Sequence, residues 1–141
     1  MPVQFFSEKI SFKLKDQARI KKWIGQVVKK EKKSVGNINY IFCDDEYLKR
    51  INRLYLKHNY YTDIITFQHE TDDKKEISGD VFISIDRVKE NAEKFDVNFG
   101  QELHRVMIHG VLHLFGYTDK SKSGKAKMTQ KEDFYLSLFK L

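Results

Sequence analysis

Two histidines and one aspartate in the C-terminal half of the chain have the types and the spacing of a metal centre. His109 and His113 are four residues apart, so a helix would place both imidazoles on one face. Gly116 follows the apolar helical run and suits the left-handed conformation that ends a helix, which lets the chain fold back toward Asp119. Two nitrogens and one carboxylate oxygen leave a fourth tetrahedral position open for water, as in catalytic zinc sites. We therefore predict one metal ion bound by these three side chains; zinc fits the ligand types best, and nickel, iron and manganese stay open.

The residue after the first histidine limits the kind of hydrolase that this site could serve. Metalloproteases with this histidine spacing carry Glu at that position, as the base that activates water. Here the position is Gly110, so general-base assistance, commonly worth about a hundredfold or more, is missing. A peptidase is therefore disfavoured. For the histidine pair alone, surface decoration or a satisfied core pair is as good an interpretation as metal binding.

Other charged residues near the predicted site offer further contacts. Arg105 lies four residues before His109 on the same helical face, so it is a candidate for binding substrate phosphate; the alternative is an ion pair with Glu102 or plain solvation. His104 would face roughly 140° away from His109 on an ideal helix, so we expect it to support a loop by hydrogen bonding. Asp63 either orients a ligand or a water molecule, or caps a turn before a strand.

Aromatic and histidine side chains outside this helix have two possible uses. Tyr60, Tyr61 and Phe67 could stack on nucleic-acid bases, although packing in the core or in loops is the commoner use of such residues. His58 and His69 lie in polar connecting segments, and we expect them to be ordinary surface histidines.

The composition is that of a folded domain with an excess of positive charge. Eleven Phe and seven Tyr with a single Pro argue against disorder. The formal net charge of +6 favours an anionic partner. Two lysine-rich stretches, residues 21–33 and 120–127, either solvate a helix face and a loop or contact nucleic-acid phosphates. The single Cys43 and the lack of a long apolar run predict a cytoplasmic protein with no membrane partner.

The hydrophobic pattern predicts strands and helices in an irregular order along one domain. Residues 38–42 alternate as a strand, with Ile38, Tyr40 and Phe42 on one side. The expected strands span 3–6, 38–42, 64–67 and 79–84, and the expected helices span 16–30, 44–55, 86–95, 98–114 and 129–141. Because strands and helices do not alternate regularly, we predict an α+β fold with a small mixed sheet packed with helices.

Polar residues at the expected helix starts predict how these helices are capped. Asp16, Asp44 and Asp86 each stand where a side chain could accept a hydrogen bond from the first turn. Asn98 and Gln101 are three residues apart, which is the spacing of a capping box before the helix that carries the histidines.

Several motifs of this chain are similar to those of one known family. The segment His109-Gly-Val-Leu-His-Leu-Phe-Gly-Tyr117 is similar to the signature of the YbeY family, bacterial single-domain metal-dependent endoribonucleases. Residues 51–55 with 62–67, residues 79–84 and residues 102–104 resemble further blocks of the same family, in the same order. The resemblance implies a single ribonuclease domain over residues 1–141, with an α+β fold and a zincin-like metal helix.

The resemblance also implies an activity. A protein of this family would bind one zinc ion per chain and use a metal-activated water to attack a phosphodiester of single-stranded RNA. It would act in 16S ribosomal RNA maturation and ribosome quality control, in the cytoplasm, with ribosomal RNA and pre-ribosomal particles as partners.

Two positions depart from the family pattern. Asp119 stands where the family usually has a third histidine, so the resemblance predicts a His-His-Asp site, and a carboxylate ligand should make the bound water less acidic than a third imidazole would. Leu56 stands where the family commonly has an arginine that assists the RNA chemistry. The adjacent Lys57 is a candidate for substrate contact, although we expect its side chain to point elsewhere, and the sequence assigns no general base.

Two other functions stay open from the sequence. One is a ribosome-assembly factor that holds a structural metal and cleaves nothing, which Leu56 makes a serious alternative. The other is a metal-dependent hydrolase of another substrate, such as a peptide or a small ester, against which Gly110 argues.

Overall fold

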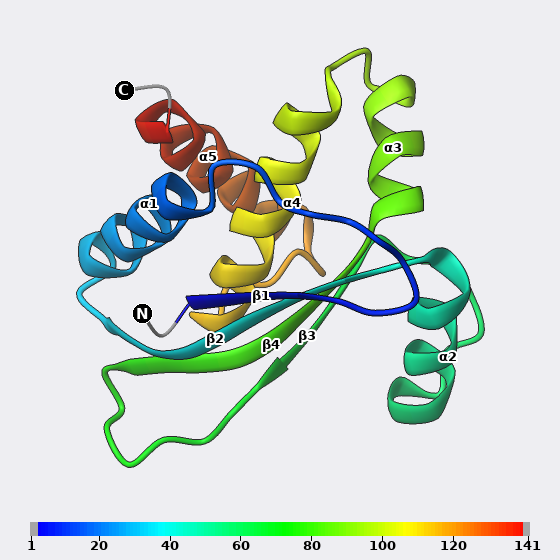
Figure 1. The fold of residues 1–141 in the computed structure, drawn as a ribbon. Helices are drawn as coiled ribbons and strands as arrows, with labels where there is room; N and C mark the ends of the chain where they lie inside the picture. The colour runs from blue at the N-terminus through cyan, green and yellow to red at the C-terminus, as the bar shows by residue number, and fades with distance from the viewer. Residues whose placement is uncertain (1–2, 140–141) are drawn as a thin grey trace.

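A computed structural model describes residues 3–139 and shows a four-stranded sheet covered by helices (Figure 1). The elements in chain order are β1 (Val3–Ser7), α1 (Gln17–Lys30), β2 (Ser34–Cys43), α2 (Asp45–Leu56), β3 (Ile64–Gln68), β4 (Glu76–Ser84), α3 (Ile85–Lys94), α4 (Phe99–Leu114) and α5 (Lys122–Phe139).

The sheet is mixed and has the strand order β1-β2-β4-β3. The β1–β2 and β2–β4 pairs are parallel, whereas β3 pairs antiparallel with β4. Both β2 and β4 begin earlier than the sequence predicts, because Ser34 pairs with Glu76 before the alternating segments start. The predicted α+β class with a small mixed sheet is confirmed.

Most of the helices cover one face of the sheet. In Figure 1, α1, α4 and α5 lie above the sheet, and α2 lies below it toward one end. Ile38, Tyr40 and Phe42 of β2 are all buried in the main core, which confirms the predicted alternation. On the other face, Leu48 of α2 packs with Ile65 of β3 in a smaller apolar cluster. The main core therefore lies between the sheet and the layer that contains the predicted metal helix.

Helix α4 approaches the sheet closely at Gly110. A Cβ atom added at this position would lie 2.7 Å from Val81 Cγ1 and 2.9 Å from Ile64 Cδ1, so the approach requires a glycine. Close by, the buried Tyr40 hydroxyl donates a hydrogen bond to the carbonyl oxygen of Met107 at 3.0 Å. These contacts fix the rotation of α4 about its own axis and thereby the direction in which its two histidines point.

Two of the predicted helix caps are confirmed. The Asp44 carboxylate accepts a hydrogen bond from the Tyr47 amide at 2.8 Å at the start of α2. Asn98 and Gln101 form the complete capping box at the start of α4. Local sequence therefore fixes where the metal helix begins.

The other two predicted caps are wrong. Asp16 precedes α1 in a left-handed conformation (φ 59°), and its side chain makes no capping hydrogen bond. Helix α3 begins one residue before Asp86, and its cap is the hydroxyl of Ser84. The Asp86 carboxylate accepts instead from the Asp45 amide at 3.0 Å, so a contact between two helices replaces the predicted local one.

Helix α5 is longer than its apolar spacing predicts. It begins at Lys122 rather than at residue 129, so most of the lysine-rich stretch at 120–127 lies on a helix and not in a loop. The Ser121 hydroxyl accepts from the Gly124 amide at 2.9 Å at this start. The predicted apolar end at Leu141 lies outside the described residues. Within residues 3–139, the chain has no helix whose length and apolar character would let it cross a bilayer.

Glu31, the residue that follows α1, joins the first helix to the last one. Its carboxylate accepts hydrogen bonds from the Tyr117 hydroxyl at 2.7 Å, from the Lys131 ammonium group at 3.1 Å and from the Tyr135 hydroxyl. Burial alone would raise the pKa of Glu31, but these hydrogen bonds lower it overall. The network also anchors Tyr117, which lies in the segment between α4 and α5.

We predict that Gly110→Ala destabilises the fold by about 1–3 kcal/mol, because the added methyl group would overlap Val81 and Ile64. The matched control is Gly25→Ala in α1, where an added Cβ meets nothing within 4 Å. That change should stabilise the protein by about 0.5–1 kcal/mol, since alanine favours a helix interior. Urea unfolding of both variants measures the difference, and equal effects would contradict the close approach.

Candidate metal centre

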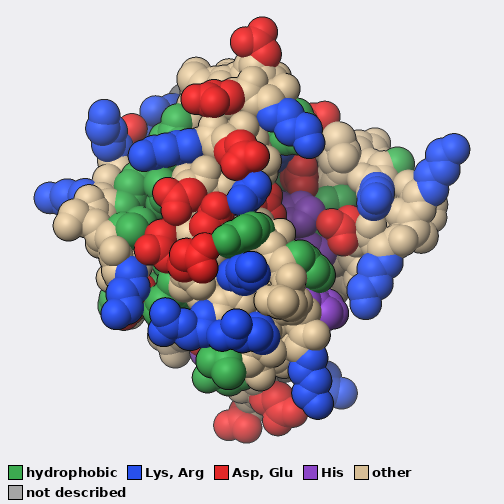
Figure 2. Space-filling view, turned by 90° about the vertical axis from the view of Figure 1, so that its right-hand side faces the viewer, with side chains coloured by type: hydrophobic (Ala, Val, Ile, Leu, Met, Phe, Trp, Pro, Cys, Tyr) green, Lys and Arg blue, Asp and Glu red, His purple; other side chains and the backbone are tan. Residues whose placement is uncertain are grey.

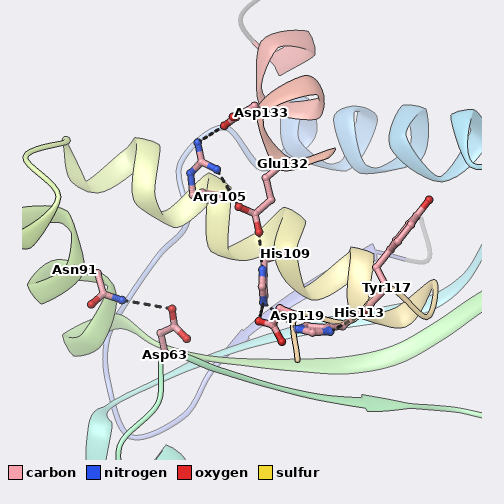
Figure 3. A network of polar contacts seen from close by, with 9 residues as sticks. All are labelled: Asp63, Asn91, Arg105, His109, His113, Tyr117, Asp119, Glu132 and Asp133. Carbon is pink, nitrogen blue, oxygen red and sulfur yellow. Dashed lines mark hydrogen bonds and ion pairs between the residues drawn. The ribbon is translucent and has the colours of Figure 1, made fainter. Parts of the chain in front are cut away.

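Helix α4 presents both histidines on one flank of the face that packs against the sheet. His109 and His113 are one turn apart and partly buried, with ring centroids separated by 4.5 Å. Nδ1 of His109 donates to Glu132 Oε2 at 2.5 Å, and Nδ1 of His113 donates to the carbonyl oxygen of Tyr117 at 3.0 Å (Figure 3). Because a carboxylate and a carbonyl oxygen both accept, the Nδ1 atoms carry the ring protons. Each Nε2 atom is then the free ligand atom.

The two free nitrogens point at one another. Nε2 of His113 lies 2.9 Å from Nε2 of His109. If both rings are neutral, each of these atoms carries a lone pair, and two lone pairs at this distance repel. A cation between the rings removes the repulsion, so the donor set fits a bound metal ion.

The turn after α4 has the conformation that the sequence predicts. Gly116 has a φ of 102°, and its amide donates to the His113 carbonyl oxygen at 2.9 Å. The next amide, of Tyr117, donates to the Leu112 carbonyl oxygen at 3.1 Å. These two hydrogen bonds make the Schellman motif, which ends the helix and reverses the chain.

The reversed chain brings the third predicted ligand to the histidines. Asp119 Oδ2 lies 3.5 Å from Nε2 of His109. Single ligand atoms of His109, His113 and Asp119 all lie within 4.8 Å of one another. The three side chains that the sequence singles out are thus close enough to hold one metal ion.

Burial, hydrogen bonds and nearby charges shift the pKa values of the two histidines in opposite directions. Burial lowers the pKa of His109, but the hydrogen bond and the charge of Glu132, with the charge of Asp119, raise it overall. Burial and the neighbouring His109 lower the pKa of His113. The surrounding carboxylates therefore favour positive charge at this point, which a divalent ion would supply.

Glu132 connects His109 to Arg105. The Arg105 guanidinium donates to Glu132 Oε1 at 2.9 Å and to Asp133 Oδ1 at 2.7 Å, so its ion pairs are with α5 and not with Glu102, which is one of the alternatives from the sequence. Because the side chain of Glu132 is only 8% exposed and holds both partners, it orients the His109 imidazole. Contact between Arg105 and substrate stays a prediction.

Sequence analysis missed Glu132 altogether. Met128, Glu132 and Tyr135 are buried along one side of α5, so this glutamate occupies a position where an apolar residue is expected. A glutamate inside an apolar helical stripe was the available signal. Its partner on α4 is set by tertiary packing, which spacing along the chain does not reveal.

A hollow of about 270 Å³ opens beside His109, and we call it the His109 hollow. Asp63, Glu102 and Asp119 are among the side chains that line it with His109. Burial raises the pKa values of Asp63 and of Glu102. The Asp63 carboxylate accepts a long hydrogen bond from Asn91 Nδ2 at 3.4 Å. Asp63 therefore faces the space next to the predicted metal ligands. This position suits the first interpretation from the sequence, in which Asp63 orients a ligand or a water molecule.

A second hollow of about 320 Å³ opens beside His113, and we call it the His113 hollow. Its walls include the predicted ligands His113 and Asp119 together with Leu56, His58 and Tyr60. Leu56 is 42% exposed, so an apolar side chain stands at the position where the resemblance leads us to expect an arginine. Both hollows thus adjoin the predicted metal centre, and Asp119 lines each of them.

Lys57 is exposed at the end of α2, in a left-handed conformation with φ 58°. It follows Leu56 directly, and its contact with a substrate stays a prediction.

His104 does not support a loop as predicted. Its ring packs edge-on against Trp23 and Phe139, with centroids at 5.9 Å and 4.4 Å, so it joins α4 to α1 and α5.

Three side chains that could hold one metal ion, on and beside a helix that packs against a mixed sheet, fit a small α+β metal-dependent hydrolase. Sequence comparison identifies the family within this class. The family model described as Endoribonuclease YbeY matches residues 3–140, and the chain therefore belongs to the YbeY family.

Individual relatives match over nearly their whole length. The endoribonuclease YbeY of Cytophaga hutchinsonii is 52% identical over 136 residues, which cover 96% of this chain and 94% of the relative. That of Flavobacterium psychrophilum is 50% identical over 134 residues, with 95% and 94% covered. The solution structure of a Thermotoga maritima protein is similar with a TM-score of 0.67 at 27% identity, covering 97% of this chain and 88% of that one.

We predict that the purified protein carries one equivalent of metal and that Asp119→Ala loses it, because two imidazoles alone leave the ion under-coordinated. Elemental analysis at known protein concentration measures the ratio. Asp72→Ala, an exposed aspartate in the β3–β4 connection, is the control and should keep its metal. Full metal content in Asp119→Ala would exclude this carboxylate as a ligand.

Glu132→Gln should weaken metal affinity by about 10- to 100-fold, because the amide holds the His109 ring less well than the carboxylate does. Competition with a fluorescent chelator measures the affinity. The control is Asp133→Asn, which likewise removes a negative charge beside Arg105 but leaves the hydrogen bond between Glu132 and His109 in place. The same affinity for both variants would mean that Glu132 only stabilises the fold.

Proposed function

We propose that this chain is a metal-dependent endoribonuclease that hydrolyses phosphodiester bonds of single-stranded ribosomal RNA precursors, as one domain over residues 1–141. Membership of the YbeY family makes the chain an endoribonuclease, a hydrolase that acts on RNA. The observation that carries the metal-dependent mechanism is the convergence of His109, His113 and Asp119 at a centre that two hollows expose.

The ligand set fits zinc, although other divalent transition metals use the same donors. When bound, such an ion polarises a phosphoryl oxygen and lowers the pKa of the attacking water. In this chain the ion would be held by the Nε2 atoms of His109 and His113 and by the Asp119 carboxylate. Glu132 and the Tyr117 carbonyl oxygen hold the Nδ1 protons and thereby keep both rings in the ligand orientation.

Asp63 is our candidate for the proton acceptor. It lines the His109 hollow with two of the predicted ligands, and burial raises the pKa of its carboxyl group toward the range in which a general base works. A base on the β3 side could take the place of the glutamate that peptidases carry after the first histidine. Arg105 and Lys57 are candidates for holding phosphate groups of the substrate.

The packing of Gly110 argues against a peptidase. At this position a peptidase has its catalytic glutamate, whereas here even a Cβ atom would overlap Val81 and Ile64 of the sheet. A side chain at this position would enter the core and not the active site. The absence of a glutamate is thus tied to the way α4 packs on the sheet.

The cellular setting is part of the proposal. Ribosomal RNA maturation and ribosome quality control would bring the protein to pre-ribosomal particles in the cytoplasm, and the excess of basic residues suits a polyanionic partner. A ribosome-assembly factor that binds RNA and cleaves nothing is the competing function, because Leu56 removes one possible phosphate contact.

We expect the zinc-loaded protein to cleave ribosomal RNA, and chelation or His113→Ala to abolish cleavage. Asp63→Asn should keep its metal but slow cleavage by about a hundredfold or more, because the amide cannot accept the proton. Gel analysis of labelled RNA measures the rate, beside elemental analysis of each variant. RNA binding without cleavage would favour the assembly factor. An unchanged cleavage rate in Asp63→Asn would exclude Asp63 as the general base.

A further inference from the structure

The His113 hollow contains an exposed aromatic pair next to the metal centre. The rings of His58 and Tyr60 are nearly parallel, with centroids 5.2 Å apart and an interplanar angle of 19°. The Tyr60 hydroxyl also lies 3.0 Å from His58 Nδ1, so the two rings hold one another in place. Tyr60 is 54% exposed. Two flat surfaces are therefore fixed within the hollow that reaches His113 and Asp119.

The backbone beneath this pair is also held in place. The side chain of Asn52, buried in α2, donates from Nδ2 to the carbonyl oxygen of Tyr60 at 3.1 Å. Because this bond uses the backbone of Tyr60, the ring itself is left for other contacts. A pre-positioned ring loses little conformational entropy when a second planar group stacks on it.

The remaining walls of the His113 hollow suit a planar heterocycle with polar edges. Leu56 and Ile64 offer apolar surface, and Thr62 and Thr66 offer hydroxyl groups. A nucleobase combines a flat apolar face with hydrogen-bonding edges, so it matches both kinds of wall. A phosphate group fits this hollow less well, since no Lys or Arg is among the described residues that line it and the carboxylate of Asp119 would repel it.

Positive charge for the strand leading to this hollow lies on α2. Lys49, Arg50, Arg53 and Lys57 occupy this helix and its end. On the face shown in Figure 2, histidine side chains lie between groups of Lys and Arg side chains. Basic residues around an aromatic platform are the usual pattern for single-stranded nucleic acid.

We propose that the His113 hollow is a subsite for one unpaired base of the RNA strand, stacked on the Tyr60–His58 pair beside the phosphodiester at the metal centre. The proposal rests on the proposed ribonuclease function and adds a reason for its strand preference. A base inside a duplex is already stacked and paired, so it cannot enter the hollow, whereas a base in a single strand can.

Other exposed tyrosines of this region already have structural partners. The Tyr61 hydroxyl donates to Glu46 Oε1 at 2.5 Å, and the Lys49 ammonium group lies 4.5 Å from the centre of its ring. Tyr55 packs edge-on against Phe67 at 5.7 Å and is not among the lining side chains of the His113 hollow. Tyr60 is therefore the residue to test, and Tyr55 is its matched control.

The test is the affinity of the full-length protein for a short unstructured oligoadenylate, measured by fluorescence anisotropy after chelation so that the strand is not cut. Tyr60→Ala should bind about 5- to 100-fold more weakly, which is the loss of one stacked base. Tyr60→Phe should bind nearly as well as the wild type because it keeps the ring. Tyr55→Ala should bind like the wild type, and thermal unfolding checks that all variants are folded.

The binding results test the base subsite independently of whether the protein cleaves RNA. Equal affinity of Tyr60→Ala and wild type, or an equal loss in Tyr55→Ala, would overturn the subsite even if the metal-loaded protein cleaves RNA. An equal loss for a matched duplex and the single strand would also overturn it. Weaker single-strand binding in Tyr60→Ala alone supports the subsite, even if no RNA is cleaved and the proposed function fails.

Discussion

The close contact between α4 and the sheet determines how the rest of the candidate metal centre is arranged. At Gly110 the helix backbone approaches Val81 and Ile64 more closely than any side chain would allow. Because side chains four residues apart share a helical face, this contact places His109 and His113 together on one flank of the face that meets the sheet. The third predicted ligand, the supporting carboxylate and both hollows are then arranged around a helix whose rotation is already fixed.

Local sequence predicted the features of the centre that depend on local geometry. The spacing of His109 and His113, the capping box at Asn98 and the left-handed Gly116 all involve residues within one or two turns, where helix geometry leaves few alternatives. The sequence could likewise place Asp119 near the histidines, because a Schellman turn reverses the chain over a short distance.

Contacts between distant elements could not be predicted from spacing. Arg105 pairs with α5 and not with the nearby Glu102, and Asp86 accepts from the start of α2 instead of capping its own helix. In each case a partner from another element competes with a local one, and only packing decides which contact forms. The same limit hid Glu132, whose role depends on α5 lying beside α4.

The contacts of Glu31 and Glu132 make the candidate metal centre depend on α5. Tyr135 contacts Glu31 and Glu132 contacts His109 from this helix, although both partners lie far away in the sequence. A change that loosens α5 would therefore free the His109 ring without touching any of the three predicted ligands.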